Sequence, residues 1–311
     1  SEGNELISYH PYKLDRTKPM PDPVVPLNPD PKSVENTEEV YYLGMRNLQF
    51  HNAHVDPNDY FFEVVRRDPG DVRANTQLGI HYRKQGDFAR AKKHLRTALK
   101  RQTANQTRVS DGESMYNLGL ILKAEGRYAD AVDTLYRAAW DYEYASAAYF
   151  QLAQISSLTG DSGRALQEAQ MAVAYNGMNL DARTLLRRSG RQEEAARIAA
   201  DVVAFDPLNY YATYELVRMG KLPEETFARL LRGVSESYLE LALYYMNNGF
   251  GDETDDILAR SESIAPYPTV EYYQAWRADA RGDRAAAGRL FAKAEAGSTD
   301  YVYPFRLETV A

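Results

Sequence analysis

The sequence repeats itself at a spacing of 34 residues, and this repeat constrains the fold more than any other feature. Small and apolar residues recur at matching offsets: Leu118, Gly119, Gly126, Ala131, Leu135 and Ala138, then Leu152, Ala153, Gly160, Ala165, Ala169 and Ala172. A fixed period of this length is typical of stacked helical hairpins, in which each unit buries its apolar face against its neighbours. The chain is therefore predicted to be an all-α solenoid.

One unit, at residues 75–98, shows the full pattern. It reads Asn75-x2-Leu78-Gly79-x2-Tyr82, then Gly86, Ala91-x3-Leu95 and Ala98. This resembles the tetratricopeptide repeat (TPR), W-x2-L-G-x2-Y followed by A-x3-F. Gly79 and Ala91 are expected where the two helices come close, because a larger side chain would push them apart, and Gly86 supplies the turn. The resemblance implies a right-handed TPR superhelix that serves as a binding surface.

Weaker copies of the unit run along the chain, and we count about eight hairpins, the sixth being the most degenerate. Several end at a proline, such as Pro69, Pro207 or Pro266, which cannot continue a helix. We predict an extended Pro-rich arm at residues 1–33, the solenoid at residues 34–300, and the start of a truncated or packed-back helix at residues 301–311. The arm is either a solvated linker or a strap that lies against the first hairpins.

Composition excludes several classes of partner. The net charge is −7 and there is no Cys. An acidic chain offers no basic field for phosphates, so no nucleic acid is expected, and without Cys there is no disulfide framework. There is no apolar run of membrane-spanning length and no signal-peptide pattern at the start of the sequence. A soluble, cytoplasmic protein that binds no membrane is predicted.

A second resemblance covers nearly the whole chain. It rests on Tyr41–Gly44, Asp56-Pro57, Arg66–Asp71, Gly79–Tyr82 and Tyr303–Glu308. These segments resemble the helical half of large bacterial proteins in which the repeats follow an N-terminal β-sandwich domain of unknown function, similar to the mutarotase superfamily. The resemblance implies that the sandwich is absent from this chain and that the complete protein handles carbohydrate. It implies no catalytic residue.

Side chains on the first helix of each hairpin, pointing away from the second helix, are expected to line the inner face of the superhelix. Aromatic and basic residues collect there, a combination that would attract an acidic protein or peptide segment. The residues predicted to contact a partner are Tyr116, Lys123, Phe150, Arg187, Arg188 and Tyr214. The alternative for each aromatic residue is packing on the next repeat. Replacing Arg187 and Arg188 by Glu is expected to weaken an acidic ligand.

The carboxylate clamp of some tetratricopeptide domains, made of Lys, Arg and Asn, is not reproduced. The inner positions that we take as equivalent hold Thr76, Ile80, Tyr116 and Leu120. A receptor for chaperone tails is therefore not predicted.

The sequence contains few candidates for a metal site or a catalytic site. His51, His54 and Asp56 form the one ligand-like cluster, but their spacing favours a turn shaped by Asn52 and Pro57, so we predict no metal and no cofactor. There is no phosphate loop, nucleophile elbow or Ser/His/Asp set. Two functions stay open: an interaction scaffold that binds a partner segment or a domain of the same protein, and the helical part of a carbohydrate-active or carbohydrate-binding protein. The second remains because glycosidase carboxylates have no fixed spacing.

Overall fold

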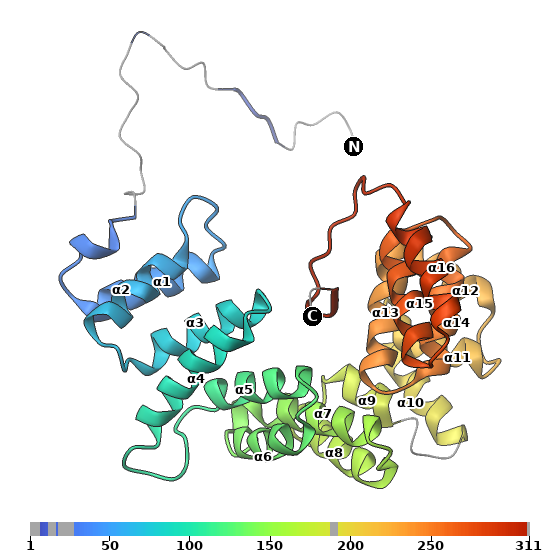
Figure 1. Cartoon of the computed structure of the whole chain (residues 1–311), viewed down its shortest axis with the longest axis horizontal. Coiled ribbons are helices and arrows are strands. Elements are labelled where there is room, and N and C mark those ends of the chain that lie inside the picture. Colours follow the sequence, from blue (N-terminus) through green and yellow to red (C-terminus); the bar gives the residue numbers. More distant parts are fainter. Residues whose placement is uncertain (1–6, 12–16, 18–27, 187–191, 310–311) are drawn as a thin grey trace. The chain divides into compact units, whose positions relative to one another are not determined.

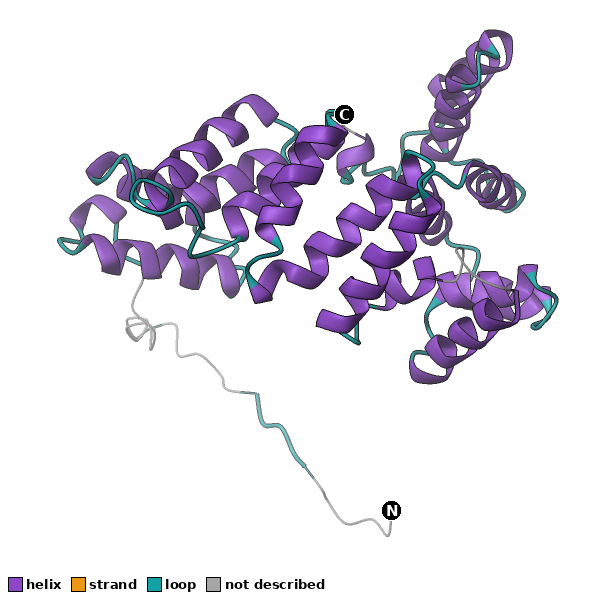
Figure 2. Cartoon of the chain, turned by 90° about the horizontal axis from the view of Figure 1, so that it is seen from below, coloured by secondary structure: helices purple, strands orange, loops and turns teal. Residues whose placement is uncertain are grey.

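The computed structural model describes residues 7–11, 17, 28–186 and 192–309, and all regular structure in these residues is helical. They form sixteen α-helices and two short 3₁₀ helices (Figures 1 and 2). No helix in this part of the chain is long and apolar enough to cross a bilayer. The chain divides into two compact units, residues 1–64 and 65–311, which are described separately.

The first unit contains η1 (Pro31–Ser33), α1 (Thr37–Gln49) and most of α2 (Pro57–Arg67). The two α-helices meet at Gly44, where an added Cβ would lie 2.9 Å from Cε1 of Phe61. Within the described part of the predicted arm, residues 28–33 lie against this hairpin. Tyr60 Oη donates to the carbonyl of Pro29 at 2.6 Å.

The loop between α1 and α2 contains the His51, His54 and Asp56 cluster. Asp56 Oδ1 accepts from the backbone N–H of Asn58 at 2.9 Å and from its side-chain amide at 2.7 Å. The carboxylate therefore shapes the start of α2. Among the residues that the structure describes, no group of three or more acidic, His or Cys side chains is arranged to hold a metal ion.

The second unit is a succession of antiparallel helices. These are α3 (Val72–Lys84), α4 (Phe88–Gln102), α5 (Glu113–Ala124), α6 (Tyr128–Ala138), α7 (Tyr142–Leu158), α8 (Ser162–Tyr175), α9 (Leu180–Leu186), α10 (Gln192–Phe205), α11 (Tyr210–Arg218), α12 (Glu224–Leu231), α13 (Ser235–Asn247), α14 (Gly251–Glu262), α15 (Pro268–Ala280) and α16 (Arg284–Glu295). Consecutive helices pack most extensively as α3/α4, α5/α6, α7/α8, α13/α14 and α15/α16. Between them, α10 packs against both α9 and α11, in the stretch where the sequence repeat is weakest.

Turn chemistry fixes where the helices of a hairpin begin and end. Gly86 and Gly126 follow α3 and α5 with φ of 75° and 71°, a left-handed conformation that side chains with a Cβ rarely adopt. After Gly86, Asp87 caps α4 by accepting from the backbone N–H of Arg90 at 2.9 Å. The same glycine-then-aspartate order recurs at Gly160 and Asp161 before α8.

Close helix contacts explain the small residues of the repeat. A Cβ added to Gly79 would lie 2.6 Å from Cγ of Leu95, and one added to Gly119 would lie 2.7 Å from Cγ of Leu135. Both leucines are fully buried, so neither has room to move aside. The prediction that Gly79 lies where the two helices of its hairpin approach closely is confirmed.

Residues 301–309, here called the returning segment, follow α16. They contain no α-helix: η3 (Leu307–Thr309) is a single 3₁₀ turn. The segment returns to α13, where the side chain of Asn247 donates to Glu308 Oε1 at 2.9 Å. The sequence predicted the start of a truncated or packed-back helix at residues 301–311; in the described residues 301–309 the one helical turn is η3.

Gly119→Ala tests the close contact. We expect it to lower the free energy of unfolding by about 1–3 kcal/mol, because the new methyl group overpacks a fully buried site. Gly288→Ala is the matched control: it lies within α16 with no atom near the added Cβ, so it should stabilise by about 0.5–1 kcal/mol through helix propensity. Urea unfolding followed by circular dichroism measures both; equal effects of the two substitutions would contradict the packing argument.

Candidate functional site

Three first helices in the second unit present an amide at the same repeat position, two residues before the small residue of the hairpin contact. These amides are Gln77 on α3, Asn117 on α5 and Gln151 on α7. Six residues after the first two amides stand two cations, Arg83 and Lys123. We call these five residues the amide strip.

Each cation of the amide strip reaches across to the amide of the next hairpin. Arg83 Nε donates to Asn117 Oδ1 at 3.0 Å, and Lys123 Nζ donates to Gln151 Oε1 at 2.8 Å. Lys123 also donates to the buried Gln154, one turn further along α7. The same interaction thus recurs from hairpin to hairpin, because the repeat sets equivalent side chains side by side.

The charges of these two cations are not neutralised by an ion pair. Within the described part of the chain neither Arg83 nor Lys123 lies within 4.0 Å of a carboxylate oxygen. Burial lowers the pKa of Arg83, and it lowers the pKa of Lys123 to about 7, although the negative charge of Glu308 acts in the opposite direction. An amide oxygen satisfies a donor without supplying a negative charge, so an added carboxylate would stabilise the protonated form of both groups and raise the pKa of Lys123.

The series continues to α13. Ser157 occupies on α7 the position that Arg83 and Lys123 hold in their helices, and its hydroxyl donates to the carbonyl of Asn248 at 2.6 Å. Next to it, Gly249 packs against Leu158, where an added Cβ would lie 3.3 Å from Cα. The end of α13 therefore lies against the end of α7. Because the returning segment contacts the same end of α13, it lies near the amide strip.

Two residues of the predicted site belong to this region. Lys123 is part of the amide strip. Tyr116 is half-buried beside it, with its ring 5.6 Å from that of Tyr144, and the positive charge of Arg83 partly offsets the effect of burial, which raises the pKa of Tyr116. The structure therefore brings together Tyr116, Lys123 and Arg83.

The remaining predicted contact residues are elsewhere. Tyr214 is fully buried in the core, its ring 5.3 Å from that of Phe227 and its hydroxyl donating to Asp256 at 2.6 Å. Phe150 packs against that core and against the cluster that contains Leu185. Both side chains therefore have the packing role that the sequence left as the alternative. Arg187 and Arg188 lie outside the described residues.

The inner positions predicted from the sequence lie one residue before the amides of the strip. Thr76, taken as an inner position, is buried against the next hairpin, where its hydroxyl lies 2.6 Å from that of the buried Ser114. The side chain one position later, Gln77, reaches Glu113 at 3.2 Å. The signal that could have found the strip is the recurrence of Gln, Asn and Gln two residues before Gly79, Gly119 and Ala153.

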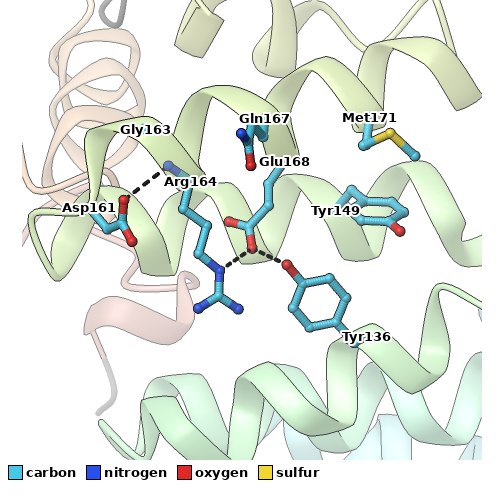
Figure 3. Close-up of a pocket in the computed structure, with 8 residues that line it drawn as sticks. All are labelled: Tyr136, Tyr149, Asp161, Gly163, Arg164, Gln167, Glu168 and Met171. Carbon is cyan, nitrogen blue, oxygen red and sulfur yellow. Dashed lines mark hydrogen bonds and ion pairs between the residues drawn. The ribbon is translucent and has the colours of Figure 1, made fainter.

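A hollow of about 750 Å³ lies along α8, beside Tyr136 of α6 and Tyr149 of α7 (Figure 3). At its floor is Glu168, whose carboxylate accepts from the Tyr136 hydroxyl at 2.5 Å, from Ser156 at 2.6 Å and from Arg164 at 3.0 Å. These donors come from α6, α7 and α8. Glu168 therefore joins three helices, and its own carboxylate is already occupied by these donors.

Comparison with known proteins identifies the repeat. A tetratricopeptide repeat family model matches residues 76–143. The crystal structure of a tetratricopeptide repeat protein from Parabacteroides merdae is similar with a TM-score of 0.50 and 15% identity, covering 88% of this chain and 99% of that chain. Residues 76–143 thus match the tetratricopeptide repeat, and the described residues have the all-α solenoid fold that the sequence predicted.

Two further solved structures are similar with lower TM-scores, and one of them covers a smaller part of this chain. The C-terminal part of a repeat-containing protein from Cytophaga hutchinsonii gives a TM-score of 0.47 and 12% identity, covering 89% of this chain and all of that chain. YrrB, described as a TPR protein with an unusual peptide-binding site, gives 0.44 and 17%, covering 59% of this chain and 93% of that chain.

Lys123→Met tests the electrostatics of the strip. Unfolded Lys123 keeps its proton up to about pH 10.4, whereas in the folded chain the pKa is about 7. Between these values the unfolded state binds more protons than the folded state. Lys123 therefore raises the free energy of unfolding of the native chain as the pH rises. The substitution removes that gain. We expect the stability of the variant relative to the native chain to be greatest near pH 6.5 and to fall steadily towards pH 9.5.

Urea unfolding at four pH values measures this difference. Lys84→Met, at an exposed lysine of α3, controls for the loss of a lysine as such. A Lys123→Met difference that does not change with pH would show that the Lys123 amine is not desolvated.

Proposed function

We propose that this tetratricopeptide repeat protein is an interaction scaffold that binds an extended segment of a partner protein along the amide strip. The observation that carries the proposal is the pair of partly buried cations, Arg83 and Lys123, which are held by neutral amide oxygens. Carboxylate groups of a bound segment would neutralise both charges. Repeats of this kind commonly mediate protein–protein contacts, and one similar structure is described as having a peptide-binding site.

The mechanism is a surface that is organised before the partner arrives. Arg83 and Lys123 are already fixed by hydrogen bonds to the following hairpin, so they lose little side-chain entropy when a ligand binds. Tyr116 adds a flat ring beside Arg83, of the kind that supplies contact area at small entropic cost. An extended segment with an acidic side chain fits this surface. The carbohydrate alternative remains a hypothesis that no residue of the described chain favours.

A peptide-display library selected on the whole chain tests the proposal. Enriched segments should carry acidic side chains, and Arg83→Gln combined with Lys123→Gln should weaken their binding about tenfold or more, since a charge-assisted hydrogen bond contributes about 1.5–3 kcal/mol. Fluorescence anisotropy with the enriched peptides measures the dissociation constants.

The matched control makes the same change of charge on a second helix. Lys93 and Arg96 are exposed on α4, and Lys93→Gln combined with Arg96→Gln should leave binding within about twofold. If both double variants weaken binding equally, the effect is one of net charge and the amide strip is not the site. If neither does, the enriched segments bind elsewhere.

A further inference from the structure

The returning segment inserts an arginine into an acidic recess on α13. Arg306 forms an ion pair with Glu236, donates through Nε to Glu240 Oε2 at 3.0 Å, and reaches the carbonyl of Glu236 at 3.3 Å. Only 11% of the Arg306 side chain is exposed. Two carboxylates and a carbonyl thus surround one guanidinium group.

Aromatic hydroxyls complete this recess. Tyr267, just before α15, donates to Glu236 Oε1 at 2.5 Å, and burial together with this hydrogen bond raises its pKa to about 12. Tyr210 of α11 lies within range of the charges of Glu240 and Arg306. A planar guanidinium with several donors matches such a set of acceptors better than a lysine ammonium does.

Two residues further along, the carboxylate of Glu308 lies against the end of α13. It accepts from the Asn247 side chain at 2.9 Å, and its charge acts on Lys123. On the other side stands Tyr273 of α15, whose buried hydroxyl has no hydrogen-bond partner in the described part of the chain. The region around Glu308 therefore offers a cation, an amide and a free hydroxyl to an acidic group.

Three aromatic side chains of the returning segment are exposed. The side chains of Tyr301, Tyr303 and Phe305 are 86%, 70% and 68% exposed. Among the side chains of this segment that the structure describes, no apolar one is buried, and the described contacts that hold it are the polar ones of Arg306 and Glu308. Such a segment is replaceable by another that makes the same two polar contacts and adds apolar ones.

We propose that the returning segment is an internal ligand of the inner face, and that partner segments carry the same pattern, an arginine followed two positions later by an acidic residue, and displace it. This proposal rests on the proposed function and specifies its partner. A partner must compete with a tethered segment, whose effective concentration is on the order of millimolar for a short connection. The free inner face therefore binds such peptides more tightly than the intact chain does.

A labelled synthetic peptide with the sequence of residues 300–309 tests this in trans. We expect it to bind Arg306→Glu in the full chain, and a chain shortened after Asp300, at least tenfold more tightly than the native chain. The peptide carrying Arg306→Glu should not bind. Arg284→Glu, at an exposed arginine of α16, makes the same charge change in the chain and should leave peptide affinity as in the native chain.

The results separate this proposal from the proposed function. If the peptide binds none of the chains, or binds the native chain and the Arg306→Glu chain equally, the internal-ligand proposal is wrong. In that case library segments that still require Arg83 and Lys123 leave the proposed function standing. Should the shortened chain not fold, the full-length Arg306→Glu chain decides the question alone.

Discussion

The close approach of the two helices in each hairpin is the interaction on which the rest of the structure depends. Where Gly79 and Gly119 face Leu95 and Leu135, there is no space for a side chain, so both hairpins stack with the same geometry. Equal stacking places equivalent positions of successive first helices side by side. The cation-to-amide contacts of Arg83 and Lys123 follow from that register, since each needs its partner in the next hairpin at the same offset.

The inner face that results carries both signs of charge. Arg83 and Lys123 lie on α3 and α5, whereas Glu236 and Glu240 lie on α13. The returning segment contacts the two carboxylates through Arg306, and the charge of Glu308 acts on Lys123. An acidic chain thus holds a localised basic site without a basic surface. Specificity for a segment would come from the order and spacing of its charges, because a uniformly acidic segment is repelled by α13 and a uniformly basic one by the strip.

The sequence predicted the hairpins well because the period, the turn glycines and the small residues are local signals. It placed the inner side chains less well: Thr76 and Gln77 are neighbours that both reach α5, but Thr76 is buried there and Gln77 stays partly exposed. Tyr214 shows a different reason. Its contacts are with Phe227 of the degenerate helix α12 and with Asp256 of α14, which belongs to the next hairpin. Contacts of residues 301–309 with α13 join residues 61 to 70 positions apart, and no periodicity predicts them.

The most direct measurement is the structure of the chain with a selected segment bound. The account predicts a ligand carboxylate within ion-pair distance of Lys123, an arginine of the ligand between Glu236 and Glu240, and residues 301–309 displaced from α13. A segment seated on the second helices, with Lys123 still bonded only to Gln151 and Gln154 and the returning segment in place, would contradict it.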